Sequence, residues 1–345
     1  MIHQTPSLHL LIPGLLGPMP SFEAAGCEVG VPALERILAC ADQEETPGND
    51  LSTTLFSLFG MAAQPDRDLP EGAVNYLGSG GAPGETCWLR ADPVHLRPDR
   101  DRLLLFSPEL LDVKQAEADE IADQINAHFA AEGIRLETPL PAHWYLHLEK
   151  CPDLVTSSLE QVVGRNIDSF LPSGPDAAKW RALSNEIQML LFNAPSNQQR
   201  EAEGRPTING LWFSGVGLLP SLKSIPFERI IGDDPSSRGL ALLAGMQPQA
   251  IPENIADVWL PEGETVLTVT DLLSPVLNAD PFRWVEQLAA LDNKLKQLTE
   301  SLKARKNARI HIYPCNGKRY TLQKKHRYRF WRRSRPLAGL LDRNQ

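Results

Sequence analysis

Four arginines carry the side-chain chemistry that is best suited to bind an anion. Arg90, Arg100, Arg102 and Arg200 each present a planar guanidinium group. Such a group donates two parallel hydrogen bonds to a carboxylate or a phosphate, which a lysine cannot do. This chemistry makes a ligand site at these residues possible, but it does not by itself distinguish them from the other arginines of the chain. The alternative for each is an arginine that forms surface salt bridges and has no ligand.

The stretch "NAPSNQQREAEGRPTINGLWFSGVG", residues 193–217, surrounds one of these arginines with amide side chains and glycines. It separates an apolar run of helical spacing from a strand-like run. Asn197, Arg200 and Asn209 are the candidate ligand-binding residues in it. The stretch fits either an anion-facing loop or a scaffold whose side chains hydrogen-bond to the protein itself.

A basic segment near the end of the chain is a candidate surface for a partner. Residues 317–335, "GKRYTLQKKHRYRFWRRSR", hold nine Lys or Arg and four aromatic residues, so the rest of the chain is correspondingly more acidic. The alternation predicts a strand or extended arm with one basic face. A protein partner fits better than RNA or DNA, because the acidic body repels phosphates. A membrane surface, or a final strand joined by salt bridges to an acidic body, is the alternative. The predicted contact residues are Lys324, Lys325, Arg327, Arg329, Trp331, Arg332 and Arg333.

The bulk composition is that of a globular protein with a sizeable core. Of 345 residues, 42% are apolar and 22% are charged, with a formal charge of −9. The five cysteines include no Cys-x-x-Cys pair, and their odd number predicts buried free thiols in a reducing compartment. The early run "LHLLIPGLLGPMP" is short and broken by proline and glycine, which predicts a buried strand and turn with no membrane span. We therefore expect a cytoplasmic protein.

Short apolar runs alternate with segments of helical periodicity along the chain. Strands are expected at "LHLLI", "RLLLF", "WYLHL", "LWFSG", "TVLTVT" and "ARIHIY", and helices over residues 108–133, 176–193 and 280–307. This alternation predicts an α/β fold with a mostly parallel sheet flanked by helices. Stretches rich in Pro, Gly and Asp near residues 64–84 and 172 indicate boundaries. We expect a core of residues 1–65 and 185–345 and an inserted α+β subdomain of residues 66–184.

Several motifs in collinear order resemble a known family. Asn197, Arg200, Gly204 and Asn209, followed by a strand that ends in a glycine turn at Gly217, form one spaced pattern. The segments "PALERILACAD", "STTLFSLFG", "WLRADPVHL", "DRDRLLLF" and "SSRGLALLAGM" supply the others. Together they resemble the archaeal-type, cofactor-independent phosphoglycerate mutases of the alkaline phosphatase superfamily. The segments "RADPVHLRPDRDRLLLF", "NEIQMLLF" and "RFWRR" are similar to a divergent bacterial branch, the RpfE-type regulatory proteins.

The resemblance implies a catalytic apparatus, and much of it has no counterpart in this chain. The family uses two divalent metals, held by Asp and His, and a Ser or Thr nucleophile. Pro13 stands where the first metal-binding Asp is expected, and Asp271 and Asp280 have no histidine between them. His311 lies inside an apolar strand, where a core role is expected. The candidate nucleophiles are Ser52, Thr53 and Thr54, next to Asp50, and helix-capping residues are the alternative.

These differences predict a non-catalytic relative of the mutases that binds without turnover and needs no metal. The resemblance to the RpfE-type proteins implies that its role is regulatory. In the relatives the arginine segments face the substrate, so a small phosphorylated ligand is expected at Arg90, Arg100, Arg102 and Arg200. The first alternative is an active mutase or phosphohydrolase with a rebuilt site that holds Mn or Zn. The second is a protein that binds nucleic acid or an acidic partner through its basic arm.

Overall fold

The computed structural model describes residues 5–17, 30–100, 102–259, 262–305, 307–329, 331–334 and 336–337. The chain divides into two compact units, Met1–Ala62 with Leu222–Gln345, and Ala63–Ser221. The first boundary lies close to the predicted one at 65/66. The second differs from the predicted boundary at 184/185, which falls inside a helix, so residues 185–221 belong to the second unit.

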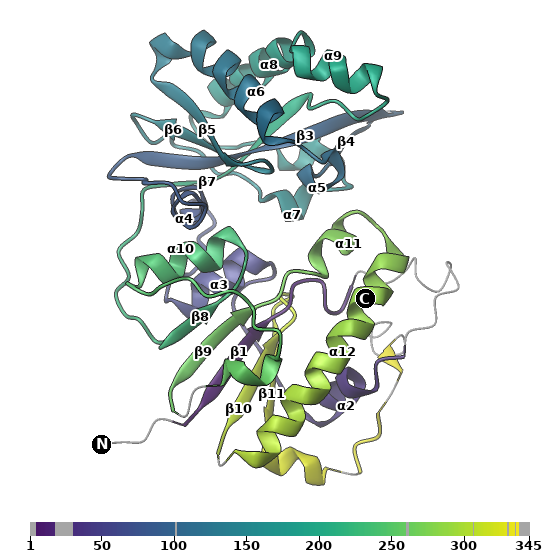
Figure 1. Ribbon diagram of the computed structural model, residues 1–345. Helices are drawn as coiled ribbons and strands as arrows, with labels where there is room; N and C mark the ends of the chain where they lie inside the picture. Colours follow the sequence, from purple (N-terminus) through teal and green to yellow (C-terminus); the bar gives the residue numbers. More distant parts are fainter. Residues whose placement is uncertain are drawn as a thin grey trace. The chain divides into compact units, whose positions relative to one another are not determined.

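A mixed six-stranded sheet forms the centre of the first unit (Figure 1). The strand order is β2 (Asp42–Glu45), β11 (Lys318–Gln323), β10 (Arg309–Tyr313), β1 (Ser7–Leu11), β9 (Glu264–Thr268) and β8 (Arg229–Ile231). Strands β10, β1, β9 and β8 run parallel, whereas β11 and β2 are antiparallel to their neighbours. The parallel sheet predicted from the alternating pattern therefore covers only part of this unit.

Helices bury one face of that sheet. Leu8 and Leu10 of β1, and Ile12 just after it, lie in a core that also holds the apolar stripe of α12 (Pro281–Ala304), from Trp284 to Leu302. The stripe recurs every three or four residues, as expected for a helix with one buried face. The other helical segments of the unit are α2 (Pro32–Cys40), α3 (Leu51–Leu58), α10 (Pro235–Leu243), η3 (Ile255–Val258), α11 (Leu273–Leu277) and η4 (Lys324–Tyr328).

The second unit is built on an antiparallel sheet (Figure 1). The order is β4 (Arg102–Phe106), β3 (Cys87–Asp99), β6 (His143–Leu148) and β5 (Ile134–Leu140), and β7 (Gly210–Gly217) also pairs with β3. No pair of described strands in this unit is parallel. The mostly parallel sheet was predicted for the core and does not extend to this unit, whose antiparallel sheet and helices fit the α+β subdomain that was predicted for the insert.

Helices α6 (Gln115–His128), α8 (Ala177–Phe192) and α9 (Pro195–Ala202) lie over one face of this sheet (Figure 1). The remaining segments are α4 (Glu71–Gly78), α5 (Pro108–Leu111), η1 (Ala130–Glu132), α7 (Leu159–Val162) and η2 (Ile167–Phe170). The single helix predicted over residues 108–133 is divided, because Asp112 adopts a left-handed conformation with φ of 44° after α5. That conformation ends a helix.

Two of the cysteines are joined, which corrects the prediction of free thiols. Cys87 at the start of β3 forms a disulfide with Cys151, just after β6, across a sequence separation of 64. Cys40 and Cys315 are buried free thiols, as expected, and Cys27 lies outside the described residues. A spacing rule cannot find this pair, because its two members are distant in sequence and meet only through the pairing of β3 with β6.

Candidate functional site

A buried ion pair lies on one face of the sheet in the second unit. Successive side chains of a strand point to opposite faces. Leu89 and Ala91 enter the core beneath the helices, so Arg90 and Asp92 point the other way. Arg90 Nη2 lies 3.0 Å from Asp92 Oδ1, to which it donates a hydrogen bond, and 3.0 Å from Oδ2.

Burial determines the electrostatics of this pair. Asp92 is fully buried, and this burial raises the pKa of its carboxyl group, while the charge and hydrogen bond of Arg90 act in the opposite direction. Burial disfavours the charged form of Arg90, but the nearby carboxylates of Asp92 and Glu71 raise the pKa of the guanidinium. The carboxylates thus favour the charged form of Arg90, while burial disfavours the charged form of Asp92.

Hydroxyl groups from both neighbouring strands flank Arg90. Tyr145 of β6 and Ser214 of β7 are directly opposite Arg90 in the two ladders, which places all three side chains on one face. The Tyr145 hydroxyl lies 2.8 Å from Ser79 Oγ. The Ser214 hydroxyl is buried and has no hydrogen-bond partner among the described residues. An unsatisfied buried hydroxyl is a group that a ligand can use.

The arrangement has the donors to bind a small anion. Within the described part of the chain, Arg90 hydrogen-bonds only through Nη2, so Nε and Nη1 are available as donors. Its side chain is 18% exposed. The Ser214 hydroxyl adds a neutral donor beside them. A carboxylate or phosphate would meet a bidentate guanidinium face whose charge Asp92 partly offsets.

His143 should make the stability of the second unit depend on pH. Burial, and then the charge of Arg90, lower the pKa of His143 from 6.5 to about 4. The unfolded chain therefore takes up this proton first, and stability is lost as the pH falls from 6.5 toward 4. We expect His143→Asn to lose less stability than the unchanged protein between pH 7 and pH 5, measured by urea unfolding. Equal losses in both proteins would contradict this assignment.

The residues predicted in the 193–217 stretch serve the fold itself. Arg200 is fully buried and donates to the carbonyl oxygens of Leu111 and Pro206 and to Glu117. Asn197 donates from Nδ2 to the carbonyls of Leu191 and Ile208, and its Oδ1 accepts from the Ile208 amide. The stretch is therefore a hydrogen-bonded scaffold at these two residues.

The remaining predicted anion-binding residues lie elsewhere on the second unit. Asn209 pairs with both backbone groups of Leu96, at 2.6 Å and 2.8 Å. Arg100 and Arg102 are exposed at the turn between β3 and β4, and Arg100 has a φ of 55°. Arg90 differs from Arg200 in its exposure: the Arg90 side chain is 18% exposed, whereas Arg200, whose Nε also has no partner among the described residues, has no exposed surface. The six residues do not gather around one ligand position, because Arg200 lies beneath the helices whereas Arg90 is on the opposite face of the sheet.

In the first unit, the predicted nucleophile region forms the start of α3. Asp50 caps this helix: its Oδ1 accepts from the Thr53 amide at 2.7 Å, and the Thr53 hydroxyl accepts from the Asp50 amide at 3.3 Å. Ser52 and Thr54 are buried. Thr53 thus has the capping role that was the alternative to a nucleophile.

The two carboxylates that remain of the expected metal site, Asp271 and Asp280, have different roles in the structure. Asp280 caps α12 by accepting from the Arg283 amide at 3.0 Å, and Asp271 is exposed in the turn after β9. Pro13 follows β1, at the position where the resemblance predicts a metal ligand. Within the described ranges, no three His, Cys, Asp or Glu side chains are grouped so that they could hold one ion.

A chain of hydrogen bonds across the first unit's sheet was not predicted. His9 Nε2 lies 2.6 Å from Glu264 Oε2, and His9 Nδ1 lies 3.0 Å from the Tyr313 hydroxyl. Burial opposes ionisation of Glu264, but the hydrogen bond and charge of His9 lower its pKa. His311 is satisfied by the Thr321 hydroxyl at 3.0 Å, in agreement with the expected core role. Burial and His9 lower the pKa of His311 to about 3.

The basic segment begins as β11 and continues as a short helical segment, so the predicted extended arm over "HRYRFWRR" is wrong. The short helical segment is η4, which carries the exposed Lys324 and Lys325. The side chain of Arg327 lies outside the described residues. Arg329 donates to Asp42 at 2.6 Å and to the Cys40 carbonyl at 2.7 Å. Arg332 donates to the Ala41 carbonyl at 3.1 Å. Trp331 and Arg333 are exposed. The segment is thus anchored to its own unit by two arginines.

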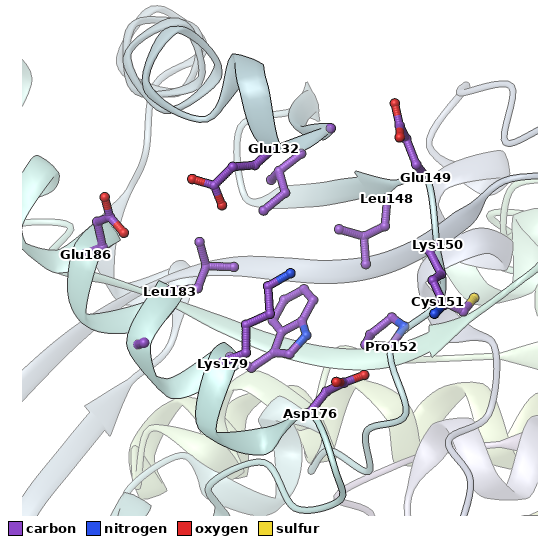
Figure 2. A pocket seen from close by; sticks show the side chains of 14 residues that line it. Glu132, Leu148, Glu149, Lys150, Cys151, Pro152, Asp176, Lys179, Leu183 and Glu186 are labelled. Atoms are coloured by element: carbon purple, nitrogen blue, oxygen red, sulfur yellow. The ribbon is translucent and has the colours of Figure 1, made fainter.

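A cavity of about 420 Å³ in the second unit lies apart from all of these residues (Figure 2). Its walls come from the region of η1, the residues after β6 and the first half of α8. The charged residues that line it are Glu132, Glu149, Lys150, Asp176, Lys179 and Glu186. Figure 2 shows Lys179 extending into the space between Glu132 and Asp176. Acidic residues outnumber basic ones, so the cavity does not attract an anion.

Comparisons with known proteins show weak similarity to the cofactor-independent phosphoglycerate mutases. The chain is 23% identical over 152 residues to the 2,3-bisphosphoglycerate-independent phosphoglycerate mutase of Methanosarcina acetivorans, covering 41% of this chain and 37% of the relative. It is 26% identical over 125 residues to the enzyme of that name from Methanosarcina mazei, covering 35% and 30%. The chain thus matches about a third of the length of these curated relatives. No family model matches it.

The fold has a counterpart among solved structures. The PH0037 protein from Pyrococcus horikoshii superposes with a TM-score of 0.52 at 16% identity, covering 93% of this chain and 87% of that one. The cofactor-independent phosphoglycerate mutase from Thermoplasma acidophilum gives a TM-score of 0.46 at 15% identity, covering 92% and 90%. The first of these shows a shared α/β fold. No described helix of this chain has the length and apolar character to cross a membrane.

Proposed function

We propose that this chain is a phosphoglycerate mutase-like protein with a regulatory role, as in the RpfE-type branch, which binds an anionic ligand without transferring a phosphoryl group. The observation that carries the proposal is the use made of the carboxylates. Asp50 and Asp280 are the caps of α3 and α12, and Pro13 follows β1. Two-metal phosphoryl transfer needs several carboxylates directed at the ions. A carboxylate that caps a helix is directed at backbone amides instead.

Turnover is the property that tests this proposal most directly. The full chain would be incubated with 3-phosphoglycerate and either Mn²⁺ or Zn²⁺, and formation of 2-phosphoglycerate followed by NMR. We expect no conversion above the rate without protein. Conversion that a chelator abolishes would overturn the proposal. It would establish the alternative, an active mutase or phosphohydrolase with a rebuilt metal site.

Binding through Arg90 is the positive part of the proposal. We expect Arg90→Gln to weaken the binding of 3-phosphoglycerate about tenfold or more, because one charge-assisted, bidentate contact contributes roughly 1.5–3 kcal/mol. Isothermal titration calorimetry measures this directly. Arg102→Gln is the matched control, since it removes the same charge from an exposed position of the same unit. Arg90→Lys keeps the positive charge beside Asp92 but loses the bidentate guanidinium. If this variant folds normally but binds weakly, the loss of binding comes from the lost ligand contact and not from misfolding.

The exposed part of the basic segment supports a second proposal, an acidic protein partner. Lys324, Lys325 and Arg333 are exposed, and Trp331 is 66% exposed beside them. Arginine and aromatic side chains are enriched at protein interfaces, and the two lysines add positive charge that suits an acidic partner. Binding to nucleic acid would give an affinity that falls steeply with salt for any sequence. Binding of a single protein at physiological salt, lost on Trp331→Ala, would favour the protein partner.

A further inference from the structure

The first unit contains a cavity of its own, and its lining differs in charge from that of the cavity in Figure 2. It has a volume of about 470 Å³ and is bounded by α2, α12, the last part of β11 and the start of η4. This size is within the range of small-molecule sites in proteins. Its apolar wall is formed by Ala33, Ile37, Cys40, Leu302 and Leu322. The cavity belongs to one compact unit and shares no residue with the Arg90 site.

Cations outnumber anions around this cavity. Arg36, Lys296, Lys303 and Lys324 line it, together with the acids Asp292 and Glu300. Asp292 is already used, because its two oxygens accept from the Ala33 and Leu34 amides at 3.2 Å and 2.7 Å. In the described ranges, none of the four cations has a carboxylate within ion-pair distance. The local potential therefore favours an anionic ligand.

A buried histidine adds an unused polar group to the lining. His326 has no exposed surface, and neither of its ring nitrogens makes a hydrogen bond among the described residues, although Nε2 lies 3.3 Å from Asp42 Oδ2. Burial, and then the charge of Arg329, lower its pKa, so the imidazole is neutral at pH 7. A buried polar group without a partner is costly unless a ligand or water satisfies it.

We propose that this cavity binds a small amphipathic anion, a molecule with an apolar body and one carboxylate or phosphate group. The apolar body would cover Ile37, Leu302 and Leu322, and the charged group would be reached by Lys296, Lys303 and Lys324. An apolar wall without charge would favour a neutral molecule. Charge without an apolar wall would favour an inorganic ion. The lining has both features, so we expect that neither a neutral apolar molecule nor an inorganic anion binds as tightly as a molecule that combines the two.

Four probes separate the contributions. Calorimetric titration of the full chain would use decanoate, decyl phosphate, decanol and inorganic phosphate. We expect at least one of the two amphipathic anions to bind, decanol to bind about tenfold more weakly or not at all, and inorganic phosphate not to bind measurably. The tighter of decanoate and decyl phosphate identifies the head group. Equal binding of decanol and decanoate, or binding of neither amphipathic anion, would overturn the proposal.

Charge-reversal variants then locate the site. Lys296→Glu and Lys303→Glu should each weaken the binding of the preferred anion about tenfold. Lys294→Glu is the matched control, because Lys294 is on the same helix but does not line the cavity. Lys296 and Lys303 are exposed, so these two variants are expected to keep the unfolding midpoint of the unchanged protein, and the midpoint of Lys294→Glu, at a half-buried position, is measured beside them. Equal weakening by Lys294→Glu would assign the effect to general charge and overturn the assignment to this cavity.

Discussion

Replacing Arg200 with alanine is expected to destabilise the second unit by about 3–5 kcal/mol. The guanidinium has no exposed surface and makes four hydrogen bonds at most 3.0 Å long, of which the one to Glu117 is also an ion pair. It donates from Nη1 and Nη2 to the Leu111 carbonyl, from Nη1 to the Pro206 carbonyl and from Nη2 to Glu117. Alanine would leave these buried acceptors without a donor and would open a cavity. Each of the two effects alone costs about 1 kcal/mol or more.

Arg205 provides the matched control for this experiment. It also contacts Glu117, at 3.0 Å from Nη1 to Oε1, but its side chain is 27% exposed. Water can replace its contacts, so Arg205→Ala should cost less than about 1 kcal/mol. Urea unfolding of the full chain measures both variants, with tryptophan fluorescence and circular dichroism compared because a chain with two units can unfold in two steps. A cost below about 1 kcal/mol for Arg200→Ala would contradict the scaffold role and restore the ligand role.

Removal of the disulfide between Cys87 and Cys151 should have the second large effect. For a closed loop with a separation of 64, the chain-entropy model gives a stabilisation of about 4 kcal/mol, and loss of a native bridge typically costs about 2–5 kcal/mol. The bridge joins the start of β3 to the segment after β6. Without it, the unfolded second unit gains conformations that the bridge excludes. We therefore expect a lower urea midpoint for the Cys87→Ser, Cys151→Ser double variant.

Reductant distinguishes the bridge from the packing of the two sulfur atoms. Dithiothreitol should lower the midpoint of the unchanged protein and leave that of the double variant where it was. A midpoint of the unchanged protein that does not respond to reduction would show that the bridge contributes nothing. The same measurement bears on the compartment, because structural disulfides persist in oxidising environments. A cytoplasmic location stays a prediction, and Cys87 and Cys151 are the residues that argue against it.

Periodicity predicted many of the elements that pack against a core, but not β3 or β5, whose Leu89, Ala91, Ile134 and Leu136 are also in the core. The six expected apolar strands correspond to β1, β4, β6, β7, β9 and β10, and the stripe of α12 starts at its Asp280 cap as expected. The polar strand β2, "DQEE", carries no apolar alternation because it is exposed on most of its length. The break after α5 depends on one residue, Asp112, whose left-handed conformation no periodic pattern indicates.

Residue type alone could not assign the arginines. Arg90 and Arg200 have the same chemistry, and only the fold shows that one keeps free donors while the other is enclosed by carbonyl oxygens. The hydrogen-bonded row of Glu264, His9 and Tyr313 was also beyond prediction. Its members are up to 304 positions apart and meet only because β1 lies between β9 and β10. Short-range motifs carry no information about such contacts.

The outermost strands of the six-stranded sheet affect how the protein behaves at high concentration. Unpaired backbone groups at the border of a sheet can recruit a strand from another molecule and start aggregation. Here β8 is only three residues long, and β2 presents Gln43, Glu44 and Glu45 to solvent. Two copies that met along β2 would bring like charges together in a layer with little water, which is unfavourable. The short length of one border and the negative charge of the other thus protect the sheet from growing into a fibre.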